Sequence, residues 1–555
     1  MKINGSQILI ETILEQGIDT VFGYPGGAIL NVYDALYKNQ DRIKHIITAH
    51  EQGAAHAADG FARSTGKTGV VFATSGPGAT NLVTGIATAY MDSIPMVAVT
   101  ANVATPLIGL DSFQEIFITG ITMPITKHNF VVRNVEDLHD IVRDAFRIAN
   151  SGRKGPVLID IPKDVTAALC EFTPMPAVEP DPIKASNLGK VKEAAKYINA
   201  AKKPVVLYGG GVQLSQAHKE LLELINKAEI PAVHTLMASG VLPYGEKLNL
   251  GLVGMHGSYS AAKALYGSDL VIAVGTRFSD RVATDKTRFA TKAKVIHIDI
   301  DAAEVNKNVK ADCPIVGDVK ETLLKLMPLV NQTTHTEWLD EIESFKKDDY
   351  VPEVTDNSLK PHQIMLAIED MIGKDDIVAT DVGQHQMWAA QYSKRSNPNC
   401  FLTSGGLGTM GYGYGAAIGA QVANPNKRVI HITGDGCFHM NLNELCTSVS
   451  FGLPIVTVIV NNRVLGMVRQ WQTLFYEKRY SNTTLERQTD YVKLAEAFGA
   501  KGYRATTEEE FKKVFKEALD SGRPCVIDAI IDKDECVWPM IAAGSTVDDI
   551  MLKLN

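Results

Sequence analysis

Two short polar segments in the C-terminal part of the chain have the residue types and the spacing of a metal site. Gly434-Asp435-Gly436 directly follows the apolar run 428–433, and Asn461-Asn462 directly follows the apolar run 455–460. The residues between them, 442–451, have helical character, so the sequence predicts strand, loop, helix and strand. A right-handed crossover brings both strand ends to one edge of a parallel sheet, where Asp435 and Asn462 can meet.

The chemistry expected at this edge is the binding of Mg2+ and a diphosphate. One carboxylate with one amide oxygen suits a hard cation and leaves room for phosphate oxygens. Gly434 and Gly436 allow the backbone to approach a ligand closely, and the N-terminus of the following helix favours an anion. Two ordinary turns are the alternative, because GDG and NN are each common. Their combination at this spacing, on two such strands, favours the functional interpretation.

A third residue of interest is Glu51, in the segment IKHIITAHEQGAAHAADGFAR. Glu51 lies just past an apolar strand-like run and begins a helix of small residues. The helix dipole alone favours a glutamate at a helix start, and for an isolated glutamate this is the simpler interpretation. The position also suits a functional carboxylate, so both interpretations stay open on these residues alone.

The chain around these residues alternates β-branched runs with helical stretches. Runs at 70–73, 96–100 and 157–161 alternate with helical stretches at 54–64 and 81–91, a pattern typical of parallel α/β units. Four prolines in the segment EFTPMPAVEPDPI oppose helix and strand and predict a linker. We therefore expect an α/β protein of three doubly wound parallel-sheet domains. The predicted boundaries are 1–172 for the first domain, 173–188 for a linker, 189–332 for the second domain, 333–358 for another linker and 359–555 for the third domain.

Composition and charge exclude several classes of protein. The 555 residues carry a net charge of -8 without a long basic run, so no nucleic-acid partner is expected. No segment approaches the roughly 18 to 20 uncharged apolar residues of a membrane span. Glu11 and Glu15 interrupt the N-terminal amphipathic segment, unlike a signal peptide. Seven cysteines without CxxC spacing predict reduced thiols, and we expect a cytoplasmic protein with no membrane partner.

The second domain contains several glycine-rich turns. They lie in YGGG (208–211), GMHGSYSAAKAL (254–265) and VGTRFSDR, and an acidic segment, HIDID, follows at 297–301. Such turns occur in most doubly wound domains, with or without a bound nucleotide. A nucleotide site and ordinary strand-to-helix turns therefore remain alternatives for each segment taken alone.

Together these segments resemble the large catalytic subunits of biosynthetic acetohydroxyacid synthases (acetolactate synthases), a thiamine-diphosphate-dependent family. The resemblance covers essentially the whole chain, from FGYPGGAIL through GLGTMGYG (406–413) and GMVRQWQ (466–472) to the tail VWPMIAAGSTVDD. It implies a pyrimidine-binding, a central FAD-binding and a diphosphate-binding domain, in that order. It also implies three cofactors: thiamine diphosphate, Mg2+ and FAD.

The resemblance implies specific roles for the residues introduced above. The side chains of Asp435 and Asn462 and the backbone carbonyl of Val464 would bind Mg2+. The family often has an acidic residue at the position of Val464, and a backbone ligand tolerates that change. Glu51, in the family's HEQGA segment, would lie against N1′ of the aminopyrimidine and help the 4′-amino group to remove a proton.

Further cofactor and active-site positions are carried over in the same way. The implied FAD contacts are Arg153, Gly209, Gly210, His256, Arg277, Asp299 and Asp318. The implied thiamine-diphosphate contacts are Glu51, Met410, Gly434, Asp435, Gly436, Asn462 and Met467. The implied active-site residues are Gly27, Glu51, Phe113, Gln114, Lys163, Arg281, Met410 and Trp471. Ser279 and Thr284 depart from the family, which usually has an aspartate and a glycine there.

Three of the active-site positions have distinct expected roles. The guanidinium of Arg281 offers a planar set of donors that can hold the carboxylate of a 2-keto acid. Met410 would support the bent conformation of the cofactor, and Trp471 would shape the pocket for the alkyl group of the second substrate. Simple core packing is the alternative for Met410 and Trp471 when they are considered without the resemblance.

The implied activity is the decarboxylative joining of pyruvate to a second 2-keto acid, the first common step of branched-chain amino-acid biosynthesis. Pyruvate as acceptor gives 2-acetolactate, and 2-ketobutyrate gives 2-aceto-2-hydroxybutyrate. Alternatives are a pyruvate oxidase, an FAD-independent catabolic acetolactate synthase, and a simple decarboxylase, whose usual His-His pair does not occur here. A regulatory module with degenerate motifs would lack Glu51 or Asp435, and both occur. A homodimer or homotetramer is expected, with a possible small regulatory subunit.

Overall fold

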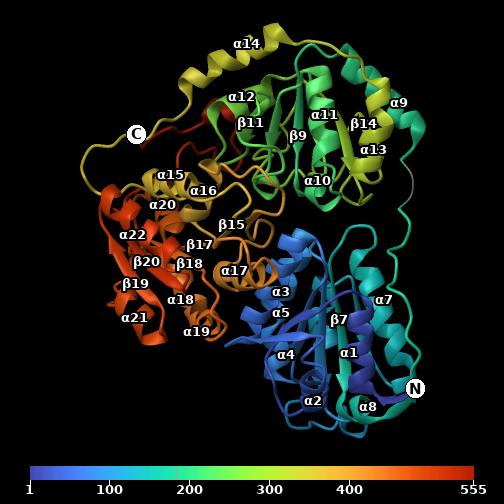
Figure 1. Cartoon of the computed structure of the whole chain (residues 1–555). Helices are drawn as coiled ribbons and strands as arrows, with labels where there is room; N and C mark the ends of the chain where they lie inside the picture. The colour runs from blue at the N-terminus through green and yellow to red at the C-terminus, as the bar shows by residue number, and fades with distance from the viewer. Residues whose placement is uncertain (184–185, 555) are drawn as a thin grey trace.

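The structure, a computed structural model, describes residues 1–183 and 186–554. Its main elements are three six-stranded parallel sheets with flanking helices, which confirms the predicted α/β fold class. In Figure 1 the N-terminal domain is blue, the central domain is green, and the C-terminal domain runs from orange to red. None of the helices in the described part of the chain is long and apolar enough to cross a membrane.

The N-terminal sheet has the strand order β3-β2-β4-β5-β7-β6, and all of its pairs are parallel. In chain order, its strands are β2 (Thr20–Gly23), β3 (Lys44–Ile47), β4 (Gly69–Ala73), β5 (Met96–Asn102), β6 (His128–Val131) and β7 (Pro156–Pro162). The helices that matter for the site are α3 (Glu51–Thr65), α4 (Pro77–Asn81) and α5 (Val83–Asp92). Apolar residues of β4, β5 and β7 are fully buried and form the core between the flanking helices.

The central sheet has the order β11-β10-β9-β12-β13-β14. Its strands are β9 (Pro204–Tyr208), β10 (Ala232–His234), β11 (Asn249–Leu252), β12 (Leu270–Val274), β13 (Lys294–Asp299) and β14 (Cys313–Val316). The chain order reverses between β9 and β12, which are parallel neighbours. A ligand crevice is expected at the carboxyl ends of the strands beside such a reversal.

The segment 333–358, expected to be a linker, contains the helix α14 (Thr336–Phe345). Trp338 anchors this helix, because its side chain is 1% exposed and its indole Nε1 donates to the carbonyl of Pro204 at 3.2 Å. The sequence pattern does not predict this helix, because the stretch is polar and only Trp338 and Ile342 of the helix are buried. The helix therefore packs on the central domain.

The C-terminal sheet has the order β16-β15-β17-β18-β20-β19. Its strands are β15 (Ile377–Thr380), β16 (Phe401–Leu402), β17 (Val429–Gly434), β18 (Val456–Asn461), β19 (Lys501–Ala505) and β20 (Cys525–Ile530). Numbered within each domain, this order is the same as that of the N-terminal sheet. The two domains therefore share one topology.

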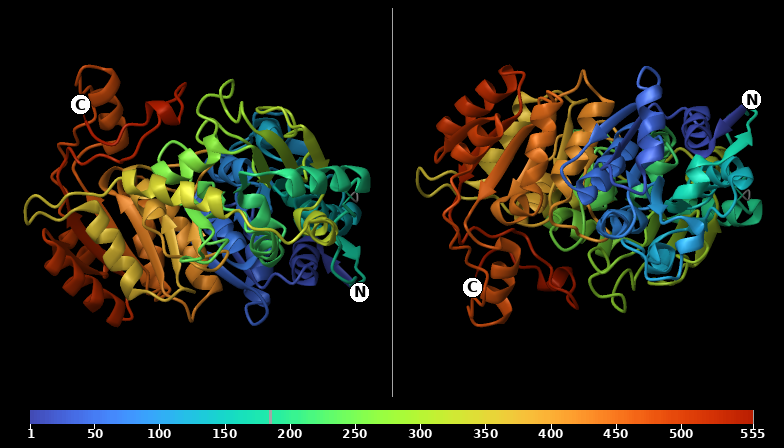
Figure 2. Two further views of the ribbon diagram at one scale, coloured as in Figure 1. Left: turned by 90° about the horizontal axis from the view of Figure 1, so that it is seen from above. Right: turned by 90° about the horizontal axis from the view of Figure 1, so that it is seen from below.

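The N-terminal and C-terminal domains meet through two helices. α3 packs along α17 (Tyr412–Ala423), and Figure 1 shows the two side by side at the centre of the molecule. Close packing depends on glycine: a Cβ at Gly60 or Gly419 would overlap the backbone of the other helix. The views from above and below show the C-terminal domain beside the N-terminal domain along this contact (Figure 2).

Candidate active site

The two strand ends that carry Asp435 and Asn462 are neighbours. β17 and β18 are parallel and aligned so that Gly434 lies opposite Val460. Asp435 follows the end of β17 and Asn462 the end of β18, so both lie at one sheet edge, as their spacing predicts. The sequence predicts a loop at Asp435, whereas in the structure the helix α18 (Asp435–Asn441) begins at this residue.

The surroundings of Asp435 and Asn462 fit a cation. The Asp435 side chain is buried, and within residues 1–183 and 186–554 it forms no ion pair. Burial raises the pKa of its carboxyl to about 7, because the charged form loses water. The Asn462 side-chain oxygen accepts from the Val464 amide at 3.2 Å. One carboxylate and one amide oxygen are the ligands that Mg2+ accepts beside phosphate oxygens.

No group of three His, Cys, Asp or Glu residues suited to a metal ion is found in the described residues. Val464 lies in an isolated bridge to Thr484, formed by hydrogen bonds from the neighbouring residues Leu465 and Leu485. Arg463, with φ of 59°, turns the chain between Asn462 and Val464.

Two further polar residues at this edge are absent from the sequence prediction. Gln384 and His385 begin α16 (Gln384–Gln391), just after β15. The Asn462 side-chain nitrogen donates to Gln384 Oε1 at 3.2 Å. A Cβ at Gly434 would lie 3.0 Å from His385 Nδ1, so the imidazole lies beside the turn. One sequence feature could have indicated Gln384 and His385: the polar run VGQHQ follows an apolar strand, as Asp435 does.

His385 is neutral at physiological pH. Burial lowers the pKa of its imidazole to about 4. Its Nε2 has no hydrogen-bond partner among the described residues. A buried polar nitrogen of this kind normally has a partner, which fits a ligand at the turn.

Glu51 lies in the N-terminal domain and has polar contacts of its own there. It is the first residue of α3, and its side chain is buried. Asn81 donates to its Oε2 at 2.9 Å. A Cβ on Gly78 would lie 3.1 Å from its Oε1, so the glycine turn crowds the carboxylate. The segment 75–81 (SGPGATN) therefore contacts Glu51.

Within one chain, Glu51 and the Asp435 edge have separate sets of polar contacts. Among the described residues, no hydrogen bond or ion pair joins Glu51 to Asp435 or Asn462. Glu444 accepts from the amides of Ala49 and His50, which directly precede Glu51. Helix α18, about 10 Å long at roughly 1.5 Å per residue, begins at Asp435 and ends before Glu444.

A large cavity lies where all three domains meet. Its volume is about 1170 Å3, above the roughly 300 to 1000 Å3 of pockets for drug-sized ligands. It opens where the strand order reverses, between β9 and β12. Gly209 and Gly275 lie close together there, and a Cβ on Gly209 would be 2.4 Å from the Gly275 carbonyl oxygen. All seven predicted FAD contacts line it: Arg153, Gly209, Gly210, His256, Arg277, Asp299 and Asp318.

Most charged groups of this cavity are held by neighbouring residues. Arg153 pairs with Glu304 at 2.7 Å. Arg277 donates to the Met91 carbonyl at 2.8 Å, which joins the central to the N-terminal domain. Asp318 caps the helix α13 (Val319–Leu326) by accepting from the Glu321 amide. Burial raises the pKa of the Asp299 carboxyl to about 6.

The two departures from the family have different surroundings. Ser279 lines the cavity. The hydroxyl of Thr284 donates to the Ser545 carbonyl at 2.8 Å and so attaches the C-terminal tail to the central domain. Thr284 therefore has a structural contact here that a glycine could not make.

The predicted active-site residues fall into two groups. Arg281 and Trp471 line the cavity, as does Met467, an implied cofactor contact. Met410 reaches Gly436, where an added Cβ would be 3.7 Å from the Met410 methyl carbon. The other group lies on the N-terminal domain and outside this cavity, and consists of Gly27, Phe113, Gln114 and Lys163. Phe113 is 88% exposed, which is unusual for a phenylalanine that the protein buries by itself.

Trp471 lies on α20 (Gly466–Phe475) and packs against Met255, Trp538 and Met540. Its ring centroid is 5.3 Å from that of Phe475. The indole therefore has both a packing role and a cavity face. The alternative of core packing accounts for only part of its environment.

Comparison with known proteins gives a consistent set of matches. Three family models match in order: thiamine pyrophosphate enzyme N-terminal TPP binding domain at residues 3–121, central domain at 191–326, and C-terminal TPP binding domain at 381–529. The acetolactate synthase large subunit of Mycobacterium tuberculosis is 48% identical, covering 99% of this chain and 91% of the relative. The large subunit of Corynebacterium glutamicum is 46% identical over 100% and 91%. A probable acetolactate synthase large subunit of Methanocaldococcus jannaschii is 47% identical over 99% and 95%.

Proposed function

The chain belongs to the acetolactate synthase large-subunit family of thiamine-diphosphate enzymes, and from this premise we infer that it joins pyruvate to a second 2-keto acid with loss of CO2. Pyruvate as acceptor gives 2-acetolactate, and 2-ketobutyrate gives 2-aceto-2-hydroxybutyrate. The observation that carries this inference is the presence of both half-sites, Glu51 with Asn81 and Asp435 with Asn462, in a chain that matches such enzymes over 99% of its length.

We propose that the C-terminal edge binds Mg2+ and the diphosphate group. Asp435 and Asn462 supply side-chain oxygens and Val464 its carbonyl, while Gly434 and Gly436 let the backbone approach the diphosphate. Gln384 orients Asn462 through their hydrogen bond. Thiamine diphosphate, when bound, supplies the carbon nucleophile and accepts the electrons released with CO2.

Glu51 is proposed to hold and move the proton at N1′ of the aminopyrimidine. Asn81 fixes the orientation of its carboxylate, and the crowded Gly78 turn excludes water from one face. A positioned carboxylate of this kind typically contributes about 10^2 to 10^4-fold to rate. Met410 is proposed to support the cofactor from the Gly436 side.

The cavity between the three domains is proposed to hold FAD. Its position at the sheet reversal and its close glycine backbones suit a dinucleotide. Arg153 and Arg277 offer cationic donors, and Asp299 and Asp318 offer acceptors. The condensation has no net oxidation, so FAD has a structural role in this proposal.

The substrate residues are proposed to act from two subunits. Arg281 would hold the carboxylate of the second keto acid and Trp471 would contact its alkyl group, on the C-terminal side of the site. Gly27, Phe113, Gln114 and Lys163 would come from the second copy, together with Glu51. Exposed apolar side chains close to Phe113 support this assembly: Leu107, Ile108, Leu110, Phe117, Ile121 and Met123.

Two tests address this assembly. Sedimentation at assay concentration should give a dimer or a tetramer, and a fully active monomer would contradict the shared site. The relatives are called large subunits, so we also propose a small regulatory partner. A change in turnover when a candidate small subunit is added would identify it.

The deciding experiment for the activity uses pyruvate, thiamine diphosphate and Mg2+ without an electron acceptor. We expect 2-acetolactate as the main product. Acetate formed only when an acceptor is added would indicate an oxidase, and acetaldehyde a decarboxylase. Either result would overturn the proposal.

A further inference from the structure

The shared topology of the N-terminal and C-terminal domains places two buried carboxylates in comparable positions. Asp92 is the last residue of α5, in the connection that follows β4. Glu444 ends the short helix at Leu442–Glu444, in the connection that follows β17. β4 and β17 hold the same place in their sheets. Neither carboxylate belongs to the proposed catalytic groups.

Asp92 reaches from the N-terminal to the C-terminal domain. Its two oxygens accept from the consecutive amides of Gly405 and Gly406, at 3.2 and 2.7 Å. Its charge is balanced by Arg63, 2.8 Å away. A Cβ on Gly406 would lie 2.7 Å from Asp92 Oδ1, so the loop lies directly on the carboxylate.

Glu444 reaches in the opposite direction with the same geometry. Its two oxygens accept from the consecutive amides of Ala49 and His50, both at 3.1 Å. Its side chain is fully buried, and Thr447 donates to it at 2.7 Å. A Cβ on Gly53 would lie 2.1 Å from Glu444 Oε1. Each domain thus binds two successive amides of the other.

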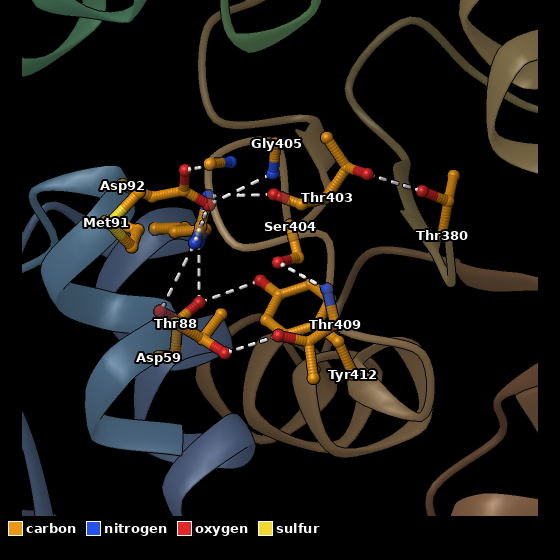
Figure 3. A network of polar contacts seen from close by, with 12 residues as sticks. Asp59, Thr88, Met91, Asp92, Thr380, Thr403, Ser404, Gly405, Thr409 and Tyr412 are labelled. Atoms are coloured by element: carbon orange, nitrogen blue, oxygen red, sulfur yellow. Dashed lines mark hydrogen bonds and ion pairs between the residues drawn. The ribbon is translucent and has the colours of Figure 1, made fainter. Parts of the chain in front are cut away.

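The loop that Asp92 binds is attached to the N-terminal domain at several more points (Figure 3). Arg63 donates to the Thr403 carbonyl at 2.9 Å. The Thr88 and Thr409 hydroxyls are 2.8 Å apart, and the Tyr412 hydroxyl donates to Asp59 at 2.7 Å. Met410 lies between the last two attachments, which leaves its backbone little freedom.

The two contacts differ in what they position. Ala49 and His50 immediately precede Glu51, so the Glu444 contact sets the direction in which Glu51 leaves the strand end. Gly405 and Gly406 precede Met410 in a loop that both domains hold. A hydrogen bond to a charged acceptor is among the stronger ones in proteins, and a carboxylate that binds two amides also fixes the peptide between them.

We propose that Asp92 and Glu444 are reciprocal positioning residues: Asp92 holds the loop that carries Met410, and Glu444 holds the turn that carries Glu51. The catalytic consequence rests on the proposed function, because it assumes that Met410 and Glu51 act on thiamine diphosphate. The mechanical part, in which each domain fixes a loop of the other, rests on the hydrogen bonds alone.

The test uses the complete enzyme with its cofactors and the variants Asp92→Asn and Glu444→Gln. An amide can accept from only one of the two backbone N–H groups that the carboxylate binds. Amide hydrogen exchange should become at least about tenfold faster at 403–412 in Asp92→Asn and at 48–52 in Glu444→Gln, with the other loop unchanged. Glu369→Gln is the matched control, since Glu369 is a buried carboxylate paired with Arg395 and distant in sequence from both loops.

Turnover gives the second measurement. A displacement of about 1 Å can cost about 100-fold in rate, so both variants should lose roughly 10- to 100-fold in kcat with a nearly unchanged KM for pyruvate. Exchange of the C2 hydrogen of bound thiamine diphosphate should slow in Glu444→Gln. Glu444→Gln gives the test alone if Asp92→Asn does not fold after Arg63 loses one of its two carboxylate partners, Asp59 and Asp92.

The outcomes separate the two proposals. Faster exchange in both loops in either variant, or equal acceleration in the control, would make the carboxylates general stabilising residues and overturn the inference. A kcat within twofold of wild type in both variants would do the same. A wild-type enzyme that forms no acetolactate would overturn the proposed function and leave the exchange result to decide the mechanical part.

Discussion

The N-terminal and C-terminal domains have the same strand order but different chemistry at their strand ends. Both contain an Asn–Asp pair at equivalent places: Asn102 on β5 donates to Asp160 on β7, and Asn461 on β18 donates to Asp528 on β20. In each pair the asparagine ends its strand, two residues beyond the position opposite the aspartate. These pairs belong to the scaffold that both domains share.

The proposed functional residues lie just outside this shared scaffold. After β17 and β18 come Asp435 and Asn462, whereas after β4 and β5 come Thr74 and Val103. After β3 comes the turn with Glu51, whereas after β16 comes the loop with Gly405 and Gly406. One fold thus supports two half-sites because loops can change while the sheet persists.

The largest effect should come from Glu51→Gln, which removes the acid of the N-terminal half-site. Glutamine keeps an oxygen that can accept from Asn81, so the turn should stay in place. We expect turnover to fall by about 10^2 to 10^4-fold, while calorimetry shows wild-type affinity for Mg2+ and thiamine diphosphate. Near-normal turnover would remove Glu51 from the mechanism.

The adjacent residues Asn461 and Asn462 allow a sharper test, because Asn461 belongs to the shared scaffold and Asn462 to the proposed metal site. Asn462→Ala should weaken Mg2+-dependent cofactor binding by at least the roughly 10- to 100-fold that follows loss of a residue supporting a metal ligand. Asn461→Ala removes a donor from buried Asp528 and should cost about 1 to 3 kcal/mol of stability, with cofactor affinity changed only a few-fold. Calorimetry and urea unfolding measure the two effects, and the reverse pattern would exchange the two roles.

The sequence predicts those features of the two domains that depend on a local residue pattern. Apolar runs and glycine turns predict the strands, and the handedness of parallel connections predicts that Asp435 and Asn462 meet. The contacts of Asp92 and Glu444 depend on residues more than 300 positions away, and no local pattern encodes such a pairing. Gln384 and His385 follow β15, at the start of α16, and the place of β15 beside β17 follows only from the complete strand order.

A substitution in the proposed acceptor pocket should have a more moderate effect, on the choice of the second substrate. Trp471→Leu should reduce the preference for 2-ketobutyrate over pyruvate, because one methylene in an apolar pocket is worth about 1 to 3 kcal/mol, or roughly 10 to 200-fold. The ratio of the two acetohydroxy acids formed from mixed substrates measures it. Phe475→Leu is the control, because Phe475 contacts Trp471 without lining the cavity. An unchanged ratio in Trp471→Leu would make the indole a packing residue.

The smallest catalytic effect is expected at the Asn–Asp pairs, where the two domains differ in charge. Asp528 pairs with Arg504 at 3.0 Å. Among residues 1–183 and 186–554, the Asp160 carboxyl has only the neutral donors Thr100 and Asn102, at 2.7 and 2.6 Å. Burial therefore raises the pKa of the Asp160 carboxyl to about 6 from an ordinary value of 3.8. The N-terminal scaffold should thus be more sensitive to pH than the C-terminal one.

Because the folded protein holds the Asp160 proton more tightly than the unfolded chain does, this proton stabilises the fold below about pH 4. The stabilisation is lost as the pH rises through about 6, where the folded carboxyl ionises. Asp160→Asn stays neutral and keeps both hydrogen bonds, since the Thr100 hydroxyl can also accept. Its stability relative to wild type should therefore rise by about 2 kcal/mol between pH 4 and pH 6, with turnover unchanged.

Asp528→Asn is the comparison variant. It deprives Arg504 of a carboxylate and should lower stability at every pH in this range. Urea unfolding of the three proteins at several pH values measures both effects. Parallel stability curves for wild type and Asp160→Asn would show that the folded protein holds the Asp160 proton no more tightly than the unfolded chain does.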